Sequence, residues 1–281
     1  MPDKPEDTTA SALRALWHLA AGDRLSADAA LERALPALDA SGIARFGALV
    51  QQRMSGTPLA HLTERQRFMG VEMVAGPGAL IPRRETELVA RAAVDLARRI
   101  ADERGSVRVM DVCTGSANVA AAVAVAEPRT IVFAADLSEE AVALARLNVV
   151  HVGVADRVSL RAGDLLAPFD DADHVGTIDL LTCNPPYISS GRVEEMPTEI
   201  SRHEPRLAFD GGPLGVRILQ RLIREAPRML RAGGWLAFEV GLGQGPSVAQ
   251  RMRGSGVYAS VETLADEHGQ VRVLVAQTTA S

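Results

Sequence analysis

The sequence is poor in aromatic residues, which make up 4% of its 281 positions. Few side chains are therefore available as platforms on which nucleic-acid bases could stack. The net charge is −5 at pH 7, so the chain also lacks the positive excess that attracts nucleic acid or an anionic membrane surface. Both features argue against a nucleic-acid partner and against membrane binding.

Cysteine is also scarce. Cys113 and Cys183 are the only two, and they lie far apart in the chain. This predicts two reduced, buried thiols rather than a disulfide framework. His61, His203 and His268 lack the spacing of metal ligands, so no metal is expected. No apolar run reaches the ~18–20 residues of a membrane span, and the polar N-terminus does not resemble a secretory signal. We expect a cytoplasmic protein.

The N-terminal part of the chain has the periodicity of amphipathic helices. Leu13 and Leu16 are three residues apart, and Leu31 and Leu35 are four apart, as along one face of a helix. We predict a small helical domain over residues 1–66. Nothing in it suggests a reactive site, so packing or the presentation of a substrate is the expected role.

Beyond this region the pattern changes to short strands. A β-hairpin linker is predicted at 67–82, broken by Gly76-Pro77-Gly78, and a larger domain at 83–281. In the larger domain apolar strands alternate with helices, which predicts a doubly wound parallel sheet of the α/β class. Two late strand-like runs, 259–264 and 271–276, have no helix between them and predict an antiparallel hairpin at one edge.

The first strand of this sheet ends in a turn of small residues. Ligands of doubly wound sheets bind beyond the carboxyl ends of the strands, and small side chains let the backbone approach a ligand. The turn does not match the G-x-G-x-x-G pattern of dinucleotide-binding enzymes, whereas a cofactor without phosphate, S-adenosylmethionine, tolerates less glycine. A turn without function would look similar. The candidate cofactor contacts here are Asp111, Cys113, Thr114, Gly115, Ser116 and Ala117.

Acidic residues end the next two strands as well. Asp136 stands where such folds place a carboxylate that accepts hydrogen bonds from both ribose hydroxyls. It could instead cap the next helix, although Ser138 could take that role. After the third strand, Asp164 is a candidate for the adenine amino group, and Leu165 for the face of the adenine ring.

A fourth strand leads into Asn184-Pro185-Pro186-Tyr187. Two prolines remove two N–H donors and leave carbonyl groups free to accept. The Asn184 side-chain oxygen and the Pro185 carbonyl can accept from one planar NH₂ group, with the Tyr187 ring against its plane. We predict methyl transfer to a planar nitrogen, with catalysis by Asn184, Pro185 and Tyr187. All four residues are expected to bind the acceptor, and Asn184 to contact the cofactor too.

At this point the chain resembles the PrmC/HemK family, from about Arg53 to the C-terminus. The resemblance implies a Rossmann-like class I methyltransferase sheet, S-adenosylmethionine as cofactor, and an N-terminal helical domain joined by a β-hairpin. It implies that the acceptor is the side-chain amide of a glutamine in a peptide chain release factor. The residues that carry the resemblance are 56–62, Phe68, 81–87, the turn at Asp111, 184–187, Glu204-Pro205, 210–212, Gly233-Gly234, 239–241, Gln244, Asp266, Gly269 and Arg272.

The chain departs from the family pattern in three places. The family turn usually has glycine where this sequence has Cys113 and Ala117, and a Cβ at a positive φ costs about 1 kcal/mol or more. Leu165 replaces an aromatic residue that members often place after the third-strand acid. The region before Arg53 matches poorly, and in the family this domain helps to recognise the release factor.

These departures keep other functions open. A divergent paralogue could methylate an amide or guanidine nitrogen of a free amino acid or small metabolite. The same motif also serves adenine N6-methyltransferases of nucleic acid, although the acidic charge disfavours them. Loss of cofactor binding through Cys113 and Ala117 would leave a non-catalytic interaction protein. Glu239, at the end of a late strand, is a further candidate substrate contact, and the run 83–87 is expected to brace the domain junction.

Overall fold

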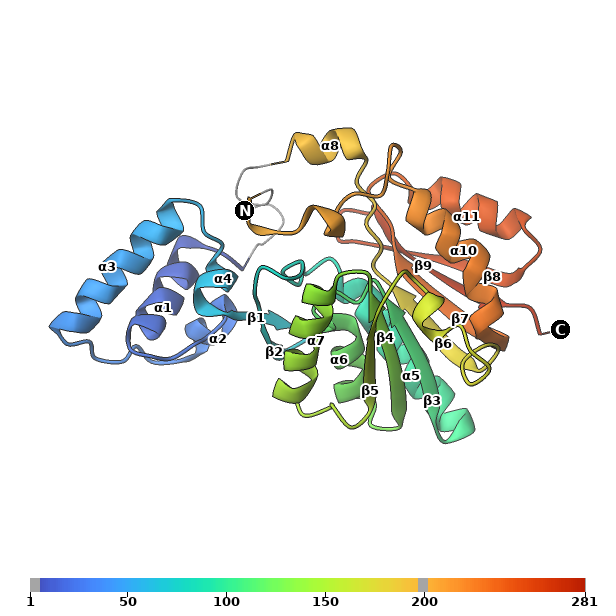
Figure 1. The fold of residues 1–281 in the computed structure, drawn as a ribbon, viewed down its shortest axis with the longest axis horizontal. Helices are drawn as coiled ribbons and strands as arrows, with labels where there is room; N and C mark the ends of the chain where they lie inside the picture. Colours follow the sequence, from blue (N-terminus) through green and yellow to red (C-terminus); the bar gives the residue numbers. More distant parts are fainter. Residues whose placement is uncertain (1–5, 197–201, 281) are drawn as a thin grey trace.

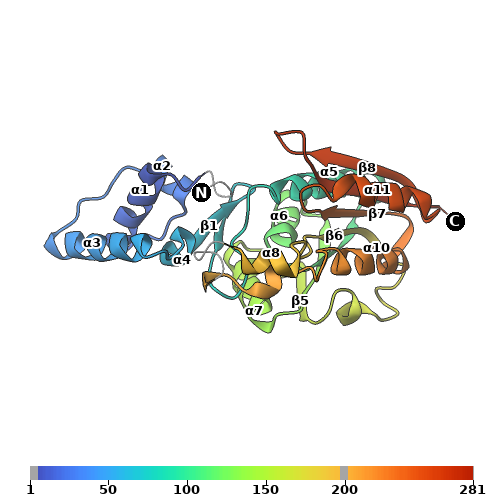
Figure 2. The same ribbon diagram turned by 90° about the horizontal axis from the view of Figure 1, so that it is seen from above.

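The computed structural model describes residues 6–196 and 202–280. Residues 1–5, 197–201 and 281, which belong to the predicted domains, lie outside those ranges. Figures 1 and 2 both show a group of N-terminal helices to one side of a layered α/β body, with a short hairpin between them. In the described residues, no helix combines the length and the apolar character that crossing a membrane requires.

Each of the first three helices begins at a side chain that caps it. α1 (Thr9–Ala20), α2 (Ala27–Glu32) and α3 (Ala40–Met54) are preceded by Thr8, Ser26 and Asp39, whose side chains accept from backbone amides of the first turn. A short helix, α4 (Leu59–Thr63), follows. These caps and the buried cluster around Leu16 and Leu59 explain why the predicted helical region folds as one unit.

The predicted helical stripe through Leu35 is wrong in its second half. α2 ends at Glu32, and Leu35 is half exposed in an extended connection to α3. Pro36 explains the ending, because proline supplies no N–H and disfavours a helical conformation in the residue before it. The chain keeps this connection close to α1 instead, since the Trp17 indole N–H donates to the Pro36 carbonyl at 2.8 Å.

The hairpin linker lies earlier than predicted. β1 (Arg65–Phe68) and β2 (Val71–Val74) pair antiparallel around Met69 and Gly70, while Gly76-Pro77-Gly78 follows the hairpin. Met69 and Gly70 both have positive φ, 50° and 78°. A two-residue turn of this kind usually carries Asn-Gly or Asp-Gly, so methionine gave no turn signal. The Asn148 side chain holds β2 by bonding both the N–H and the C=O of Val74.

The larger body is the doubly wound sheet that the sequence predicts. Its seven strands have the order β5-β4-β3-β6-β7-β9-β8. The first five in this order are parallel, and β9 pairs antiparallel with both β7 and β8, which confirms the terminal hairpin. The strands are β3 (Val107–Val112), β4 (Thr130–Asp136), β5 (Val158–Ala162), β6 (Ile178–Cys183), β7 (Leu230–Glu239), β8 (Tyr258–Ala265) and β9 (Val271–Thr278).

Helices cover both faces of the sheet. On one face α5 (Glu87–Arg104), α6 (Asn118–Ala126) and α7 (Glu139–His151) share a buried cluster with Val109 of β3. On the other, α10 (Arg217–Met229) and α11 (Gly245–Gly254) share a cluster with Met110, the next residue of the same strand. The strand order reverses between β3 and β6, and ligands of such sheets bind at this switch point.

Candidate functional site

A cavity of about 390 Å³ opens beyond the carboxyl ends of β3, β4 and β6. Its volume falls within the roughly 300–1,000 Å³ of small-molecule sites. The predicted cofactor contacts come together here, apart from Ser116 and Ala117, which are buried within the turn and do not line the cavity. The predicted residues that line this cavity, called the cofactor pocket below, are Asp111, Cys113, Thr114, Gly115, Asp136, Asp164, Leu165 and Asn184.

Asp111 forms the base of the pocket. It is 2% exposed and accepts hydrogen bonds from the hydroxyls of Thr114, in the turn, and Thr182, on the neighbouring strand β6. Burial raises the pKa of its carboxyl to about 6, because the charged form is poorly solvated there. The carboxylate therefore links two adjacent strand ends and shapes the turn between them.

The turn after β3 adopts positive φ at alternate residues. Cys113, Gly115 and Ala117 have φ values of 55°, 56° and 63°. Both residues that replace family glycines thus occupy the left-handed region, where a Cβ is disfavoured. Cysteine and alanine nevertheless occupy these two positions, and the turn lines the cofactor pocket.

Asp136 faces the pocket with both carboxylate oxygens fixed. Oδ2 accepts from the Gly115 amide at 2.8 Å, and Oδ1 accepts from the Ser138 amide at 2.9 Å. Burial raises the pKa of Asp136, and these backbone bonds oppose the shift. The Ser138 side chain caps α7 by accepting from Ala141. The alternative role of Asp136 as the cap of that helix is therefore taken by Ser138.

Asp164 also lines the pocket but has a partner that the sequence did not reveal. Both of its oxygens lie within 3.1 Å of Arg221 Nη1, from α10. The ion pair joins the loop after β5 to α10. Leu165, beside it, is buried with a φ of 48°.

The residues Asn184 to Tyr187 lie at the boundary between two cavities. Asn184 and Pro186 line the cofactor pocket, whereas Tyr187 lines a second, larger cavity. Pro185 is buried and lines neither cavity. Among the described residues, none borders both cavities.

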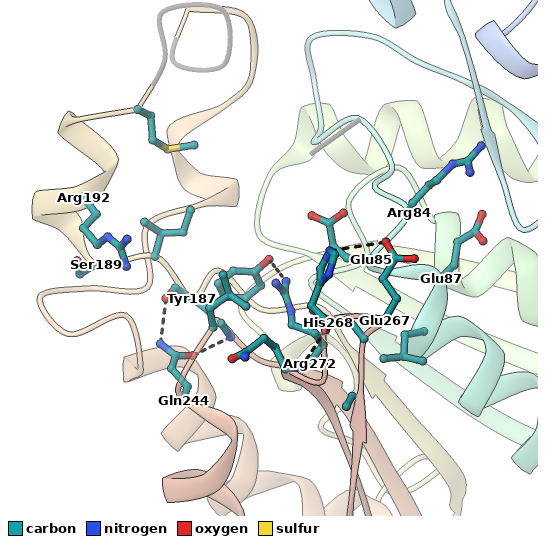
Figure 3. A pocket seen from close by; sticks show the side chains of 18 of the residues that line it. Arg84, Glu85, Glu87, Tyr187, Ser189, Arg192, Gln244, Glu267, His268 and Arg272 are labelled. Carbon is teal, nitrogen blue, oxygen red and sulfur yellow. Dashed lines mark hydrogen bonds and ion pairs between the residues drawn. The ribbon is translucent and has the colours of Figure 1, made fainter. Parts of the chain in front are cut away.

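The second cavity, called the acceptor groove below, has a volume of about 1330 Å³. Its lining carries both signs of charge, and Figure 3 shows Tyr187 and Gln244 on one side with Arg84 and Glu87 on the other. Leu214 and Leu242 border it and are 80% and 63% exposed. The Tyr187 carbonyl accepts from Gln244 Nε2 at 3.1 Å, which fixes the backbone at the groove.

Behind Tyr187 lies a buried polar cluster that the sequence did not reveal. The Tyr187 hydroxyl donates to Glu239 Oε1 at 2.9 Å, and Arg272 Nη2 donates to both, at 3.2 Å each. Thr86 donates to Glu239 Oε2 at 2.8 Å and accepts from Asn184 Nδ2 at 3.0 Å. Glu239 is fully buried, so the structure places it behind the groove. The sequence had instead suggested Glu239 as a substrate contact, which would require it at the surface of the groove.

The run 83–87 divides into residues with different roles. Arg83 forms a buried ion pair with Glu204 at 2.7 Å, and Arg84 pairs with Asp28 of α2 at 3.1 Å. The pair of Arg84 with Asp28 joins the N-terminal helices to the larger domain, whereas the pair of Arg83 with Glu204 lies within the larger domain. Thr86 instead turns into the polar cluster. Within the described part of the chain, no three histidine, cysteine or acidic side chains are grouped as metal ligands.

Comparison with known proteins identifies methyltransferase relatives of this chain. Residues 91–216 match the family model described as "Methyltransferase small domain". The release factor glutamine methyltransferase of Moorella thermoacetica is 38% identical over 83% of this chain and 79% of its own length. That of Streptomyces coelicolor is 39% identical over 75% and 72%. That of Bacillus subtilis is 32% identical over 83% and 79%.

Solved structures agree on the fold. The catalytic domain of human METTL16, in complex with an RNA hairpin of the MAT2A 3'UTR, has a TM-score of 0.56 at 13% identity, covering 88% of this chain and 84% of that one. The N-terminal domain of the same protein, in complex with SAH, has a TM-score of 0.54 at 15% identity, covering 74% and 76%. At these identities the likeness concerns the class I methyltransferase fold alone.

The pocket and the relatives lead to one assignment. A pocket of the right size with acids at successive strand ends suits S-adenosylmethionine, which is the cofactor of this methyltransferase. The identity to curated relatives extends over four fifths of the chain. The chain therefore belongs to the family of release factor glutamine methyltransferases.

Proposed function

We propose that the protein transfers a methyl group from S-adenosylmethionine to the side-chain amide nitrogen of a glutamine in a peptide chain release factor. The names of the curated relatives support this acceptor. The observation that carries the chemistry is the position of Asn184, which lines the cofactor pocket while Tyr187, three residues on, lines the acceptor groove.

In this proposal the cofactor pocket holds the nucleoside by its acids. Asp136 accepts from the ribose hydroxyls, since each of its oxygens has a lone pair beyond the one used by a backbone amide. Leu165 lies against the adenine ring and Asp164 near its amino group. The turn from Asp111 through Ala117 supports the remaining part of the molecule. When bound, the cofactor supplies an electrophilic methyl group on its sulfonium.

The acceptor amide is held by groups that only accept hydrogen bonds. Asn184 lines the cofactor pocket, and because its Nδ2 donates to Thr86, its Oδ1 is the end of the amide that can accept from a ligand. Oδ1 and the Pro185 carbonyl each accept one N–H of the acceptor NH₂, and the Tyr187 ring packs on its plane. This fixes the nitrogen in line for displacement and raises its electron density, so positioning and electrostatics provide the catalysis.

The acceptor groove supports a protein substrate over a small metabolite. Its volume of about 1330 Å³ exceeds the range typical of small-molecule sites. The exposed Leu214 and Leu242 at its border provide apolar contact area, and its charges of both signs suit a polypeptide. Nucleic acid would instead favour a basic surface, so the proposal includes no nucleic-acid substrate.

We also propose that the N-terminal helices, within 1–66, form a unit that contacts the release factor, joined by the hairpin linker to the catalytic domain at 83–281. Glu32 of α2 pairs with Arg67 of the hairpin at 2.6 Å, and the Ser26 hydroxyl donates to Glu72. These bonds fix the helical unit to the hairpin, so that a partner docked on it stands in a defined relation to the groove.

The proposed function is tested by incubating the protein with methyl-labelled cofactor and purified release factor. We expect label on the glutamine of the Gly-Gly-Gln sequence and none on a release factor in which that glutamine is replaced. Free glutamine, free arginine and adenine-containing DNA and RNA serve as competing acceptors. An unlabelled release factor, in the presence of bound cofactor, would refute the proposal, and label on a competing acceptor would identify the alternative.

A further inference from the structure

A fully buried carboxylate is linked to the Asn184 side chain through one intervening residue, Thr86. Glu239 ends β7 and is 0% exposed. It accepts from the hydroxyl of Thr86 on Oε2, and from the Tyr187 hydroxyl and Arg272 Nη2 on Oε1, at 2.8 to 3.2 Å. All three partners can donate, and an ionised carboxylate can only accept. The contacts therefore match the charged form of Glu239.

Arg272 and two hydroxyl donors favour this ionised form against the effect of burial. Burial raises the pKa of Glu239, while Arg272 and the hydroxyls of Thr86 and Tyr187 oppose that shift, and the charge of Glu85 adds to it. Arg272 is itself 8% exposed, so the ion pair lies in a region of low dielectric where its attraction is strong. The pair leaves the cluster with balanced charge.

The charge of Glu239 decides how the Thr86 hydroxyl is used. A hydroxyl has one proton to donate, and Thr86 donates it in the hydrogen bond to the ionised Glu239. Thr86 Oγ1 can then only accept from Asn184, so the amide must present its NH₂ to Thr86 and its oxygen to the other side. If the partner of Thr86 were a donor, the hydroxyl would turn toward Asn184, and the amide would present the opposite end.

The same carboxylate also holds the ring of Tyr187. The Tyr187 hydroxyl donates to Oε1, and the Arg272 guanidinium, which donates to both groups, lies 5.8 Å from the centre of the ring. Asn184 and Tyr187 are the two side chains proposed to grip the acceptor amide. Both are therefore anchored on Glu239, although Glu239 borders neither cavity.

We propose that Glu239 and Thr86 are positioning residues that set the orientation of the Asn184 amide, so that its oxygen and not its nitrogen meets the acceptor NH₂. A misoriented amide would place two donors face to face and remove one hydrogen bond from the transition state. The inference rests on the proposed function, because it assigns a purpose to the orientation of Asn184 in amide methylation.

The first test compares kinetic constants of single variants. Thr86→Val removes the hydroxyl at nearly the same volume, and we expect kcat with release factor to fall about a hundredfold. The KM for release factor should stay within about threefold, since both hydrogen bonds of Thr86 Oγ1 go to protein groups. Because Thr86 also lines the cofactor pocket, the dissociation constant for cofactor is measured in each variant and kcat is compared at saturating cofactor. Thr86→Ser keeps the hydroxyl and should restore kcat to within about threefold of the wild type.

A matched control separates positioning from packing. Thr130 is also a buried threonine, whose hydroxyl donates to the Glu127 carbonyl at 2.9 Å at the start of β4, away from both cavities. Thr130→Val should lower stability to a similar degree and leave kcat unchanged. If Thr86→Val does not fold, Thr86→Ala takes its place. A kcat within twofold of the wild type for the Thr86 variant, or equal losses in Thr86→Val and Thr86→Ser, would overturn the inference.

The link to Glu239 is tested by a double-mutant cycle. Glu239→Gln places an amide beside Thr86, which can act as a donor and reverse the hydroxyl, so kcat should again fall. Adding Thr86→Val to this variant should reduce kcat by less than threefold, because the two residues act through one chain of bonds. Independent, multiplicative losses would contradict a shared role.

A measurement without acceptor distinguishes failure of this inference from failure of the proposed function. The side-chain NH₂ protons of Asn184, assigned by NMR from their loss in Asn184→Asp, should exchange slowly with solvent in the wild type and in Thr130→Val. In Thr86→Val they should exchange at least tenfold faster. If the wild-type protein methylates no release factor, the proposed function fails and this exchange still decides the orientation. Equal exchange in both threonine variants would refute it.

Discussion

The backbone amide of Gly115 donates a hydrogen bond of 2.8 Å to Oδ2 of Asp136. This bond joins the turn after β3 to the end of β4, and the Ser138 amide holds the second oxygen of the same carboxylate. Asp136 is thus fixed before any ligand arrives, with both oxygens oriented by the backbone. Such preorganisation lowers the entropic cost of binding.

We expect Asp136→Asn to weaken cofactor binding by at least tenfold. The amide NH₂ of asparagine cannot accept, so one backbone amide and one ribose hydroxyl lose their partner, and hydrogen bonds to a charged group contribute about 1.5–3 kcal/mol each. Isothermal titration calorimetry with S-adenosylmethionine measures the change. Asp170→Asn, which removes an exposed ion pair with Arg228, is the control and should bind normally. Unchanged affinity in Asp136→Asn would remove this residue from the cofactor site.

The positive φ of Cys113 makes a stability prediction. Cys113→Gly and Cys113→Ala both remove the sulfur, but only the alanine keeps a Cβ in the left-handed region at a φ of 55°. We expect Cys113→Gly to be more stable than Cys113→Ala by about 1 kcal/mol. Urea unfolding of the two variants gives the difference directly. A more stable alanine variant would show that this turn does not carry the strain assigned to it.

Cofactor affinity should depend on pH through Asp111. The pKa of this buried carboxyl is raised to about 6, so below pH 6 it is mostly protonated in the free protein. The cofactor carries a net positive charge and favours the ionised carboxylate, so binding must release the proton. We expect a constant dissociation constant above pH 7, and a rise of up to tenfold for each pH unit below 6.

Calorimetry in buffers of different ionisation enthalpy should detect this proton release near pH 6. Asp111→Asn provides the control, since its affinity should be lower overall and nearly independent of pH in the same range. Because burial also raises the pKa of Asp136, a residual slope in this variant would assign part of the effect to that residue. Proton uptake on binding would contradict the sign of the prediction.

Gly215 predicts a separate effect on the catalytic loop. A Cβ there would come within 2.3 Å of the Tyr187 carbonyl oxygen, and its φ is 68°. Gly215→Ala should therefore displace Tyr187 and lower kcat at least tenfold, with cofactor affinity nearly unchanged. Gly176→Ala is the matched control, because Gly176 has a φ of 70° and nothing within 4 Å of the position that an added Cβ would take. Both variants should lose stability, and only the first should lose activity.

The sequence predicted those parts of the site that depend on local pattern and chain topology. Asp111, Asp136 and Asn184 each stand at or next to the carboxyl end of an apolar strand, and parallel strands bring these ends to one edge. Their convergence in the cofactor pocket follows from this rule without knowledge of side-chain contacts. The antiparallel pairing of β8 and β9 followed likewise from the missing helix between them.

The contacts behind the site could not be predicted in this way. Thr86, Glu239 and Arg272 come from three elements widely separated in the chain, and nothing in their local sequence signals that they meet. The ion pair of Asp164 with Arg221 is of the same kind. Such partners depend on side-chain geometry after the chain has packed. The hairpin was misplaced for a local reason, since Met69 adopts a turn conformation that methionine rarely takes.

The division of the site into two separately lined cavities also has a kinetic consequence. The cofactor pocket and the acceptor groove share no lining residue among those described, and the stretch from Asn184 to Tyr187 borders the one and then the other, so we expect each molecule to enter through its own cavity. The demethylated product of the cofactor can then be exchanged for S-adenosylmethionine while a large protein stays bound in the acceptor groove. Initial-rate measurements should accordingly show random addition of the two substrates rather than a compulsory order, and product inhibition by the nucleoside should be competitive with cofactor alone.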